Sequence, residues 1–159
     1  LDPPVRREHA GLLPGLATMV EVGDWAGFGR RVRIVVVALA ALGAGAVGGG
    51  ALLGPWATQT FFGDEFTATG AEFASLTLAA VVIVLALVAA QAMIALGRHR
   101  LVALGWLAGS LAFVAASLAS PAGLEVRALS AGIIGPVVSL TVLGWSFLAA
   151  EHEHRPTPA

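Results

Sequence analysis

Residues 73–96 are the stretch that most constrains the fold of this chain. They read FASLTLAAVVIVLALVAAQAMIAL, without one ionisable side chain, and they are followed by the polar turn Gly97-Arg98-His99-Arg100. A helix that rises about 1.5 Å per residue would make this run roughly 36 Å long, which is enough to cross the roughly 30 Å hydrocarbon core of a bilayer. We therefore expect a transmembrane helix here.

A soluble fold would have to bury a helix that is apolar on every face, and this usually requires a large polar shell. No such shell is present, because 57% of the 159 residues are hydrophobic and only 12% are charged. Further apolar runs predict spans at about 34–53, 101–118 and 128–149. The sequence thus predicts an all-α, polytopic membrane bundle whose transmembrane domain of four helices occupies residues 34–149.

The composition also argues against several functions. Nine Lys and Arg residues stand against ten Asp and Glu residues, so there is no basic excess with which to bind nucleic acid. The absence of cysteine excludes disulfides and thiol catalysis, and no serine has a base near it in sequence to activate it. The histidines lie outside the spans; residues 151–154, EHEH, could bind a metal weakly, but a disordered polar tail is the reading we favour. We expect neither an enzyme nor a cofactor or metal site.

The two ends of the chain are more polar than its middle. Residues 1–33 predict a cytoplasmic or interfacial lead-in, in which Asp24 caps an amphipathic helix that places Trp25 and Phe28 on one face. Residues 150–159 predict a cytoplasmic polar tail. The chain begins at Leu1 without a signal peptide, so we expect a fragment of a longer protein.

Arginines fix the expected orientation of the bundle. If the helices alternate in direction, nearly all arginines fall on one side and Arg127 falls on the other. The positive-inside rule then places the C-terminus in the cytoplasm, and for a bacterial chain with this orientation we expect the inner membrane as the location. The same side chains could bind lipid phosphates, or they could simply form the solvated ends of the helices; they are Arg30, Arg31, Arg33, Arg98 and Arg100.

Small residues and one amide predict how the helices pack. Ala44, Gly45, Gly48 and Gly49 form small-xxx-small pairs, which would allow a close neighbouring helix; a thin or kinked helix is the alternative. The first span should end at Gly54-Pro55-Trp56, with the tryptophan at the membrane interface. Gln91 is the one strongly polar side chain well inside a span, and it is expected to form an interhelical hydrogen bond rather than a substrate contact.

The motif of Gly132, Gly135 and Pro136 predicts a kinked or unwound fourth span, because proline removes a helical hydrogen bond. In a transporter the kink could act as a hinge or line a cavity, whereas in a static bundle it would be a packing bend. The sequence alone slightly favours the bend.

The order of these features resembles one family of membrane proteins. The segments GLLPGLATMVEVGDWAGFGRRVRI, LLGPWATQTFFGDEF and FASLTLAAVVIVLALVAAQAMIALGRHRLVALGW are similar to the C-terminal part of polysaccharide-biosynthesis flippases of the multidrug/oligosaccharidyl-lipid/polysaccharide exporter superfamily. The family's loop after a span is matched by Phe61-Phe62-Gly63-Asp64-Glu65-Phe66, and its turn by Gly97-Arg98-His99-Arg100. The resemblance covers roughly residues 11–148.

The resemblance implies a part of the second lobe of a larger transporter. Such a transporter flips undecaprenyl-linked oligosaccharides by alternating access, and cationic cavity residues hold the carrier phosphate. The implied partners are membrane lipid, the lipid-linked oligosaccharide as cargo, and the remaining helices of the full-length transporter. The alternative hypothesis is a small four-helix membrane scaffold or assembly partner that transports nothing.

Overall fold

The fold is all-helical, as the sequence predicts. A computed structural model describes residue 23, residues 25–63, residue 65 and residues 68–119 and 123–153. In this part of the chain there are four helices and no strand: α2 (Trp25–Phe62), α3 (Gly70–Ala95), α4 (His99–Ala119) and α5 (Leu124–Glu153). Each of the four is long and apolar enough to cross a membrane. The described part of the chain is therefore a multi-pass membrane bundle.

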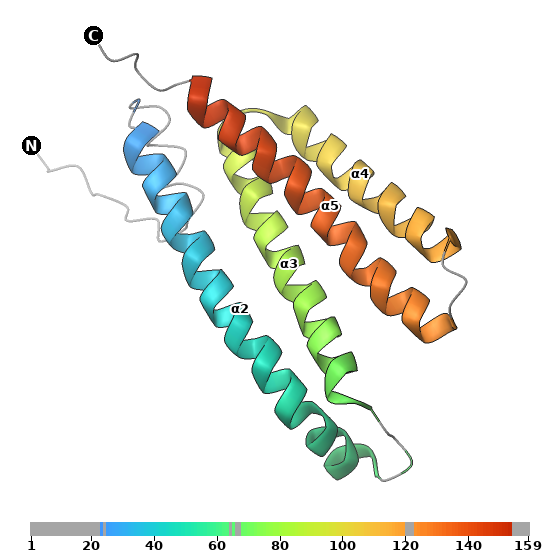
Figure 1. Ribbon diagram of the computed structural model, residues 1–159. Helices are drawn as coiled ribbons and strands as arrows, with labels where there is room; N and C mark the ends of the chain where they lie inside the picture. The colour runs from blue at the N-terminus through green and yellow to red at the C-terminus, as the bar shows by residue number, and fades with distance from the viewer. Residues whose placement is uncertain (1–22, 24, 64, 66–67, 120–122, 154–159) are drawn as a thin grey trace, which may run out of the picture.

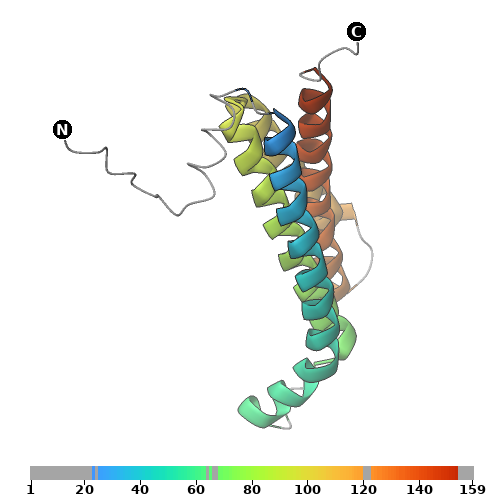
Figure 2. The same cartoon turned by 90° about the vertical axis from the view of Figure 1, so that its left-hand side faces the viewer.

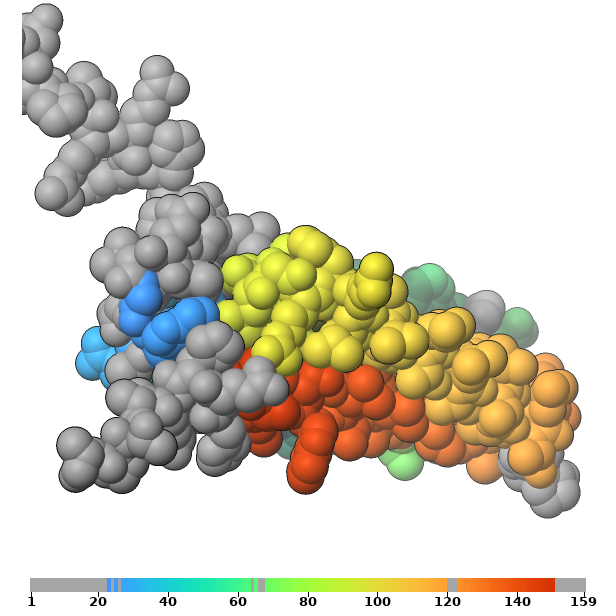
Figure 3. Space-filling view, turned by 90° about the horizontal axis from the view of Figure 1, so that it is seen from above, coloured from blue at the N-terminus to red at the C-terminus, as the bar shows by residue number. Residues whose placement is uncertain are grey.

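The helices lie side by side in the order α2, α3, α5 and α4, so that α5 inserts between α3 and α4 (Figure 1). Successive helices run in opposite directions. The start of α2, the turn between α3 and α4, and the end of α5 consequently lie at the same end of the bundle. Figure 3 looks onto this end and shows α4 lying along α5, away from the start of α2.

The first predicted span is longer than expected at both ends. The amphipathic segment at Trp25 and the span from Ile34 are one continuous helix, α2, which also passes through Pro55 and ends at Phe62. Figure 2 shows the last turns of α2 bending away from the helix axis. Proline explains the bend, because it removes one helical hydrogen bond and displaces the preceding turn. The prediction that Gly54-Pro55-Trp56 ends this segment is therefore wrong: the helix bends and continues.

The fourth predicted span also extends further, since α5 runs from Leu124 to Glu153. Its last residues were predicted to belong to the polar tail. The helix is continuous through Gly132, Gly135 and Pro136, so it is not unwound there, whereas the favoured packing bend and the alternative of a hinge stay predictions. The lead-in of residues 1–22, the Asp24 cap and the tail from residue 154 onward lie outside the described residues.

A capping box starts α3. The Thr69 hydroxyl accepts a hydrogen bond from the Glu72 backbone N–H at 3.2 Å, and the Thr69 backbone N–H donates to Glu72 Oε2 at 2.7 Å. Two backbone N–H groups that lack helical partners are satisfied in this way. The box fixes where the most apolar helix of the bundle begins.

Replacing Thr69 with alanine should therefore destabilise the start of α3 by about 1 kcal/mol, the usual cost of losing an N-cap. Amide hydrogen exchange measures this directly, and exchange at Glu72 should accelerate while exchange in the middle of α3 stays unchanged. Thr69→Ser keeps the hydroxyl and serves as the control. Equal protection of Glu72 in the alanine variant and the parent would contradict the assignment of the cap.

The other two turns are also fixed by hydrogen bonds. Gly97 adopts a positive φ of 71°, and the N–H groups of Gly97 and Arg98 donate to Ile94 O and Met93 O at 2.9 and 3.0 Å. These two hydrogen bonds form a Schellman motif. Glycine adopts the positive φ that this motif requires at the lowest steric cost. On α5, the Arg127 guanidinium donates to Ser117 O near the end of α4, with Nε at 2.9 Å. Arg127, the arginine predicted to lie apart from the others, thus caps the end of the neighbouring helix α4.

The core between the helices is thin and is built mainly from alanine. One cluster joins Phe28, Val32 and Ala92, and Phe147 of α5 packs against it. A second cluster joins Ala86, Ala89 and Ala90 of α3 to Leu143 of α5. Most large aliphatic side chains point outward instead, which suits helices whose outer surface faces lipid.

Glycines bring the backbones close together, but they are not the predicted ones. Ala44, Gly45 and Gly48 are exposed, and a Cβ added at Gly45, Gly48 or Gly49 would meet nothing within 4 Å. The contact with α3 is made by Gly43, Gly50 and Gly54, where an added Cβ would collide with Val81, Thr77 and Phe73 respectively. The former set therefore does not face α3, because those residues lie on other faces of α2, and their contact with another neighbouring helix stays a prediction.

Candidate functional site

The antiparallel fold gathers the predicted headgroup arginines at one end of the bundle. Arg30, Arg31 and Arg33 lie in the first turns of α2, while Arg98 and Arg100 flank the start of α4. Because α2 and α4 both begin at this end, cations that are 65 residues or more apart in sequence share one level. We call this level the arginine end. Among the described arginines, Arg127 is the one placed elsewhere, near the end of α4.

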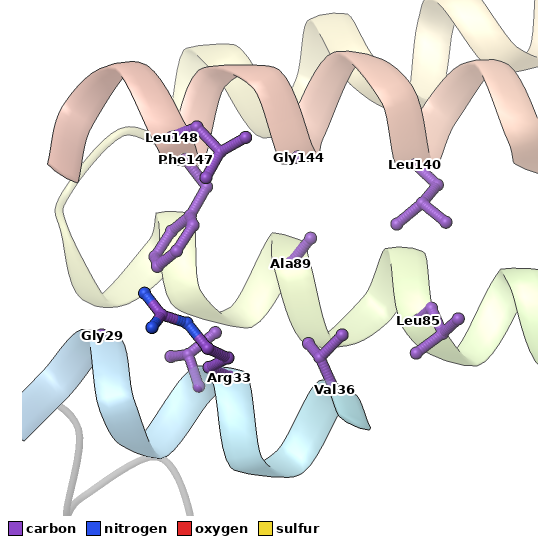
Figure 4. Close-up of a pocket in the computed structure, with 10 residues that line it drawn as sticks. Gly29, Arg33, Val36, Leu85, Ala89, Leu140, Gly144, Phe147 and Leu148 are labelled. Carbon is purple, nitrogen blue, oxygen red and sulfur yellow. The ribbon is translucent and has the colours of Figure 1, made fainter. Parts of the chain in front are cut away.

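A groove of about 280 Å³ opens between α2, α3 and α5 next to the arginine end. Its lining is apolar except for one cation, the Arg33 guanidinium (Figure 4). The wall from α2 consists of Gly29, Val32, Arg33 and Val36, the floor from α3 of Leu85 and Ala89, and the wall from α5 of Leu140, Gly144, Phe147 and Leu148.

Small residues explain why there is a groove at this place. Gly29, Ala89 and Gly144 contribute one methyl group at most, so three helices meet here without filling the space between them. A Cβ added at Gly144 would meet no atom within 4 Å. Next to the groove the aromatic rings of Phe28 and Phe147 lie 6.1 Å apart at a tilt of 40°, a spacing at which aromatic pairs attract one another. This contact ties α2 to α5 at the arginine end.

The Arg33 side chain runs along the groove toward Phe147 (Figure 4). An aliphatic groove with a single guanidinium at its mouth is chemically suited to an amphiphile, with a hydrocarbon chain along the walls and an anionic group at the arginine. None of the described residues that line the groove carries a carboxylate, hydroxyl or imidazole that could take part in acid–base or nucleophilic chemistry. Binding, rather than catalysis, is what this arrangement supports.

The five predicted arginines are not equivalent in the structure. Arg33 lines the groove, whereas Arg31 is two residues away and therefore lies on nearly the opposite side of α2. Arg98 is half-buried, and Arg30 and Arg100 are exposed. Sequence reasoning could predict the common level of these arginines from alternating helices, but it could not single out Arg33, whose role depends on side chains from α3 and α5.

Gln91 does not have the predicted interhelical hydrogen bond, since no bond joins its amide to another described residue. It is half-buried, and it shares one face of α3 with Val84, Leu87 and Ile94, which are 43%, 44% and 37% exposed. The interhelical hydrogen bond of Gln91 is thus not made among the four described helices, and it stays a prediction for a helix outside them.

The Gly132, Gly135 and Pro136 motif serves the contact between α5 and α4. A Cβ at Gly135 would lie 2.9 Å from Phe113 Cβ and 3.1 Å from Gly109 O, whereas one at Gly132 would meet nothing within 4 Å. Pro136 lines a second apolar groove with Gly109, Phe113 and Ser139. Sequence reasoning found the motif but missed Gly109, because its partner is on another helix.

Two acidic residues, Glu72 and Glu125, lie at the opposite end of the bundle, whereas Glu151 and Glu153 belong to the last turn of α5, at the arginine end. The carboxyl group of Glu125, in the first turn of α5, lies beside that of Glu72 in the first turn of α3. Both therefore lie across the bundle from the arginine end. Asp64 lies outside the described residues.

Comparison with known proteins gives relatives but no family. No family model and no solved structure matches the chain. Similar curated proteins are the uncharacterized proteins Rv3630 and Rv1510 of Mycobacterium tuberculosis H37Rv and the uncharacterized protein Mb3654 of Mycobacterium bovis. Each is 35% identical over 116 residues, which are 71% of this chain and 27% of the relative. The chain therefore spans about a quarter of the length of the curated relatives that it matches.

Proposed function

We propose that the chain is the C-terminal portion of a flippase that moves undecaprenyl-linked oligosaccharide across the bacterial inner membrane by alternating access. The observation that carries the proposal is the apolar groove between α2, α3 and α5, with Arg33 at its mouth. Lipid-linked sugars are amphiphiles that join a long hydrocarbon chain to a phosphate. A hydrocarbon surface beside a group of arginines has the two chemistries that such a cargo needs.

Two further observations support a role as part of a larger transporter. The outer faces of α2 and α4 expose large aliphatic side chains, among them Leu42, Leu52, Leu107 and Leu111, to which further helices of a second lobe could pack. The curated relatives are also about four times as long as the matched part. In this proposal the arginine end faces the cytoplasm, following the positive-inside rule, and the C-terminus lies on the same side.

A scaffold without transport activity is the competing function, and the observation that favours it is the continuity of α5. A helix that remains unbroken through Pro136, with close glycine contacts to α4, is suited to a static bundle. In the transporter proposal, α4 and α5 would instead move together as one rigid pair.

Transport in vesicles tests the proposal. The full-length protein that contains this chain would be reconstituted, and movement of a fluorescent undecaprenyl-linked oligosaccharide between leaflets would be followed by quenching from outside. We expect a double Arg33→Gln, Arg98→Gln variant to lower the initial rate about tenfold or more, because each lost phosphate contact is worth about 1 kcal/mol. Leu111→Ala, on the exposed face of α4, is the control.

Two results would refute the proposal. The first is absence of movement by the parent protein when lipid of the correct length is supplied on either side. The second is an unchanged rate in the double arginine variant, which would separate these cations from the cargo. Stable oligomers without transport would instead favour the scaffold.

A further inference from the structure

We propose that the groove between α2, α3 and α5 is a binding site for one acyl chain of an anionic bilayer phospholipid, whose phosphate contacts Arg33. This site would be occupied whether or not the full-length protein transports anything, so the inference does not depend on the proposed function. Its occupant is a resident lipid of the surrounding leaflet, which a transported cargo would displace when it enters the groove.

The length of the groove favours a bilayer lipid. Its lining extends from residue 29 to 36 on α2 and from residue 140 to 148 on α5. At about 1.5 Å per residue these segments are about 10–12 Å long, measured from the arginine end inward. One leaflet contributes roughly 15 Å, half of the hydrocarbon core. The groove therefore matches the depth reached by a single acyl chain, whereas a chain crossing both leaflets would extend well beyond Leu140.

The charge of the mouth favours an anionic headgroup. Among the described residues that line the groove, Arg33 is the charged one, and Arg30 lies one helical turn before it on α2. A guanidinium can donate two parallel hydrogen bonds to a phosphate, and it is more weakly hydrated than an ammonium group. A headgroup with net negative charge gains from both arginines, while a zwitterionic headgroup also brings a cation toward them.

The cross-section of the groove allows a test by filling it. Gly144 lines the α5 wall, and a side chain added there would begin in open space. Leucine at this position would occupy the path of an acyl chain without a clash at Cβ, and it would leave Arg33 in place. Filling the groove and neutralising its mouth are thus separate perturbations of the same site.

Photo-crosslinking of a lipid probe in vesicles is the decisive measurement. The full-length protein would be reconstituted in phosphatidylcholine vesicles that contain a small fraction of phosphatidylglycerol with a diazirine in one acyl chain. After irradiation, adducts would be mapped by mass spectrometry of peptides. We expect adducts concentrated on Leu85, Leu140 and Leu148, with competition by unlabelled phosphatidylglycerol but not by additional phosphatidylcholine.

Three variants show whether both parts of the site are needed. Arg33→Gln should reduce the adducts in the groove about fivefold, the contribution expected of one arginine near an anionic headgroup. Arg31→Gln removes the same charge from the same helix but from nearly the opposite side, so labelling of the groove should be unchanged. Gly144→Leu should abolish labelling of Leu85 while the exposed face of α4 remains labelled.

Several outcomes would overturn the inference. Adducts as dense on Leu107 and Leu111 of α4 as in the groove would indicate ordinary contact with surrounding lipid. Equal effects of Arg31→Gln and Arg33→Gln would indicate attraction by the whole arginine end. Displacement of the probe by undecaprenyl phosphate at lower concentration than by phosphatidylglycerol would assign the groove to a carrier lipid. Crosslinks from the groove to residues 1–22 would show that the chain itself covers it.

Discussion

Replacing Gly109 with alanine is expected to destabilise the contact between α4 and α5 by about 2–3 kcal/mol. An added Cβ would collide with Ser139 Oγ and would lie 2.7 Å from the backbone oxygen of Gly135. The side chain of Ser139 is only 2% exposed and has little room to move. The Gly135 carbonyl is part of the α5 backbone and cannot move without the helix. The two helices must therefore separate, at a cost typical of overpacked cores. This cost exceeds the gain of about 1 kcal/mol in helix propensity from glycine to alanine.

The free energy of unfolding can be measured by titration with a denaturing detergent, using tryptophan fluorescence as the probe. Gly132→Ala is the matched control, because it makes the same substitution in α5 where an added Cβ meets nothing within 4 Å. That variant should be more stable than the parent by about 0.5–1 kcal/mol, since alanine loses less backbone entropy than glycine on folding. If Gly109→Ala were as stable as Gly132→Ala, the close approach of α4 to α5 would be disproved.

The helices themselves could be predicted from the sequence because a bilayer imposes a length. Apolar runs such as 73–96 and 101–118 correspond to α3 and α4 within a few residues at each end. The ends of α2 and α5 were less predictable, since polar residues continue a helix beyond the membrane as readily as they end it. Pro55 illustrates the difficulty, because proline is compatible with either a bend or a stop, and the sequence does not say which.

Helix faces were harder to predict than helix ends. In the second half of α2, small residues occur on every side of the helix, so a small-xxx-small pair such as Gly45 and Gly49 identifies no particular face. The face of α2 that packs is selected by α3. Its side chains Val81, Thr77 and Phe73 lie against Gly43, Gly50 and Gly54 respectively. The packing face of α2 thus depends on residues of another helix. A motif within α2 therefore could not predict it.

The groove of the candidate site could not be predicted from the sequence for the same reason. Its lining residues come from three helices and are separated by as many as 119 positions, from Gly29 to Leu148. The sequence indicated that arginines would gather at one end, because that follows from alternating helices. It could not indicate that Gly29, Ala89 and Gly144 would leave a space beside Arg33, since this depends on which faces of α2, α3 and α5 meet.

Replacing Ala86 with arginine is expected to have the largest effect of any single change considered. Ala86 is near the middle of α3, is fully buried, and belongs to the cluster with Leu143 of α5. A central arginine costs about 2.5–3.5 kcal/mol in insertion of a transmembrane helix. In the folded bundle it would also force α3 away from α5, which adds about 1–3 kcal/mol of overpacking. We expect poor insertion and, for the molecules that insert, loss of the folded bundle.

The adjacent residue separates these two contributions. Leu87 lies at the same depth but is 44% exposed, on the side of α3 away from Leu143. In a glycosylation-based insertion assay of residues 70–95, Leu87→Arg should cost about as much as Ala86→Arg, because the assay reports depth and not packing. In a detergent micelle the arginine introduced at position 87, on the exposed face of α3, can reach water. Leu87→Arg should therefore retain the folded bundle, whereas Ala86→Arg should not. Equal unfolding of both variants would mean that α3 and α5 do not pack through Ala86, whereas failure of the unsubstituted segment 70–95 to insert would mean that α3 does not span the membrane.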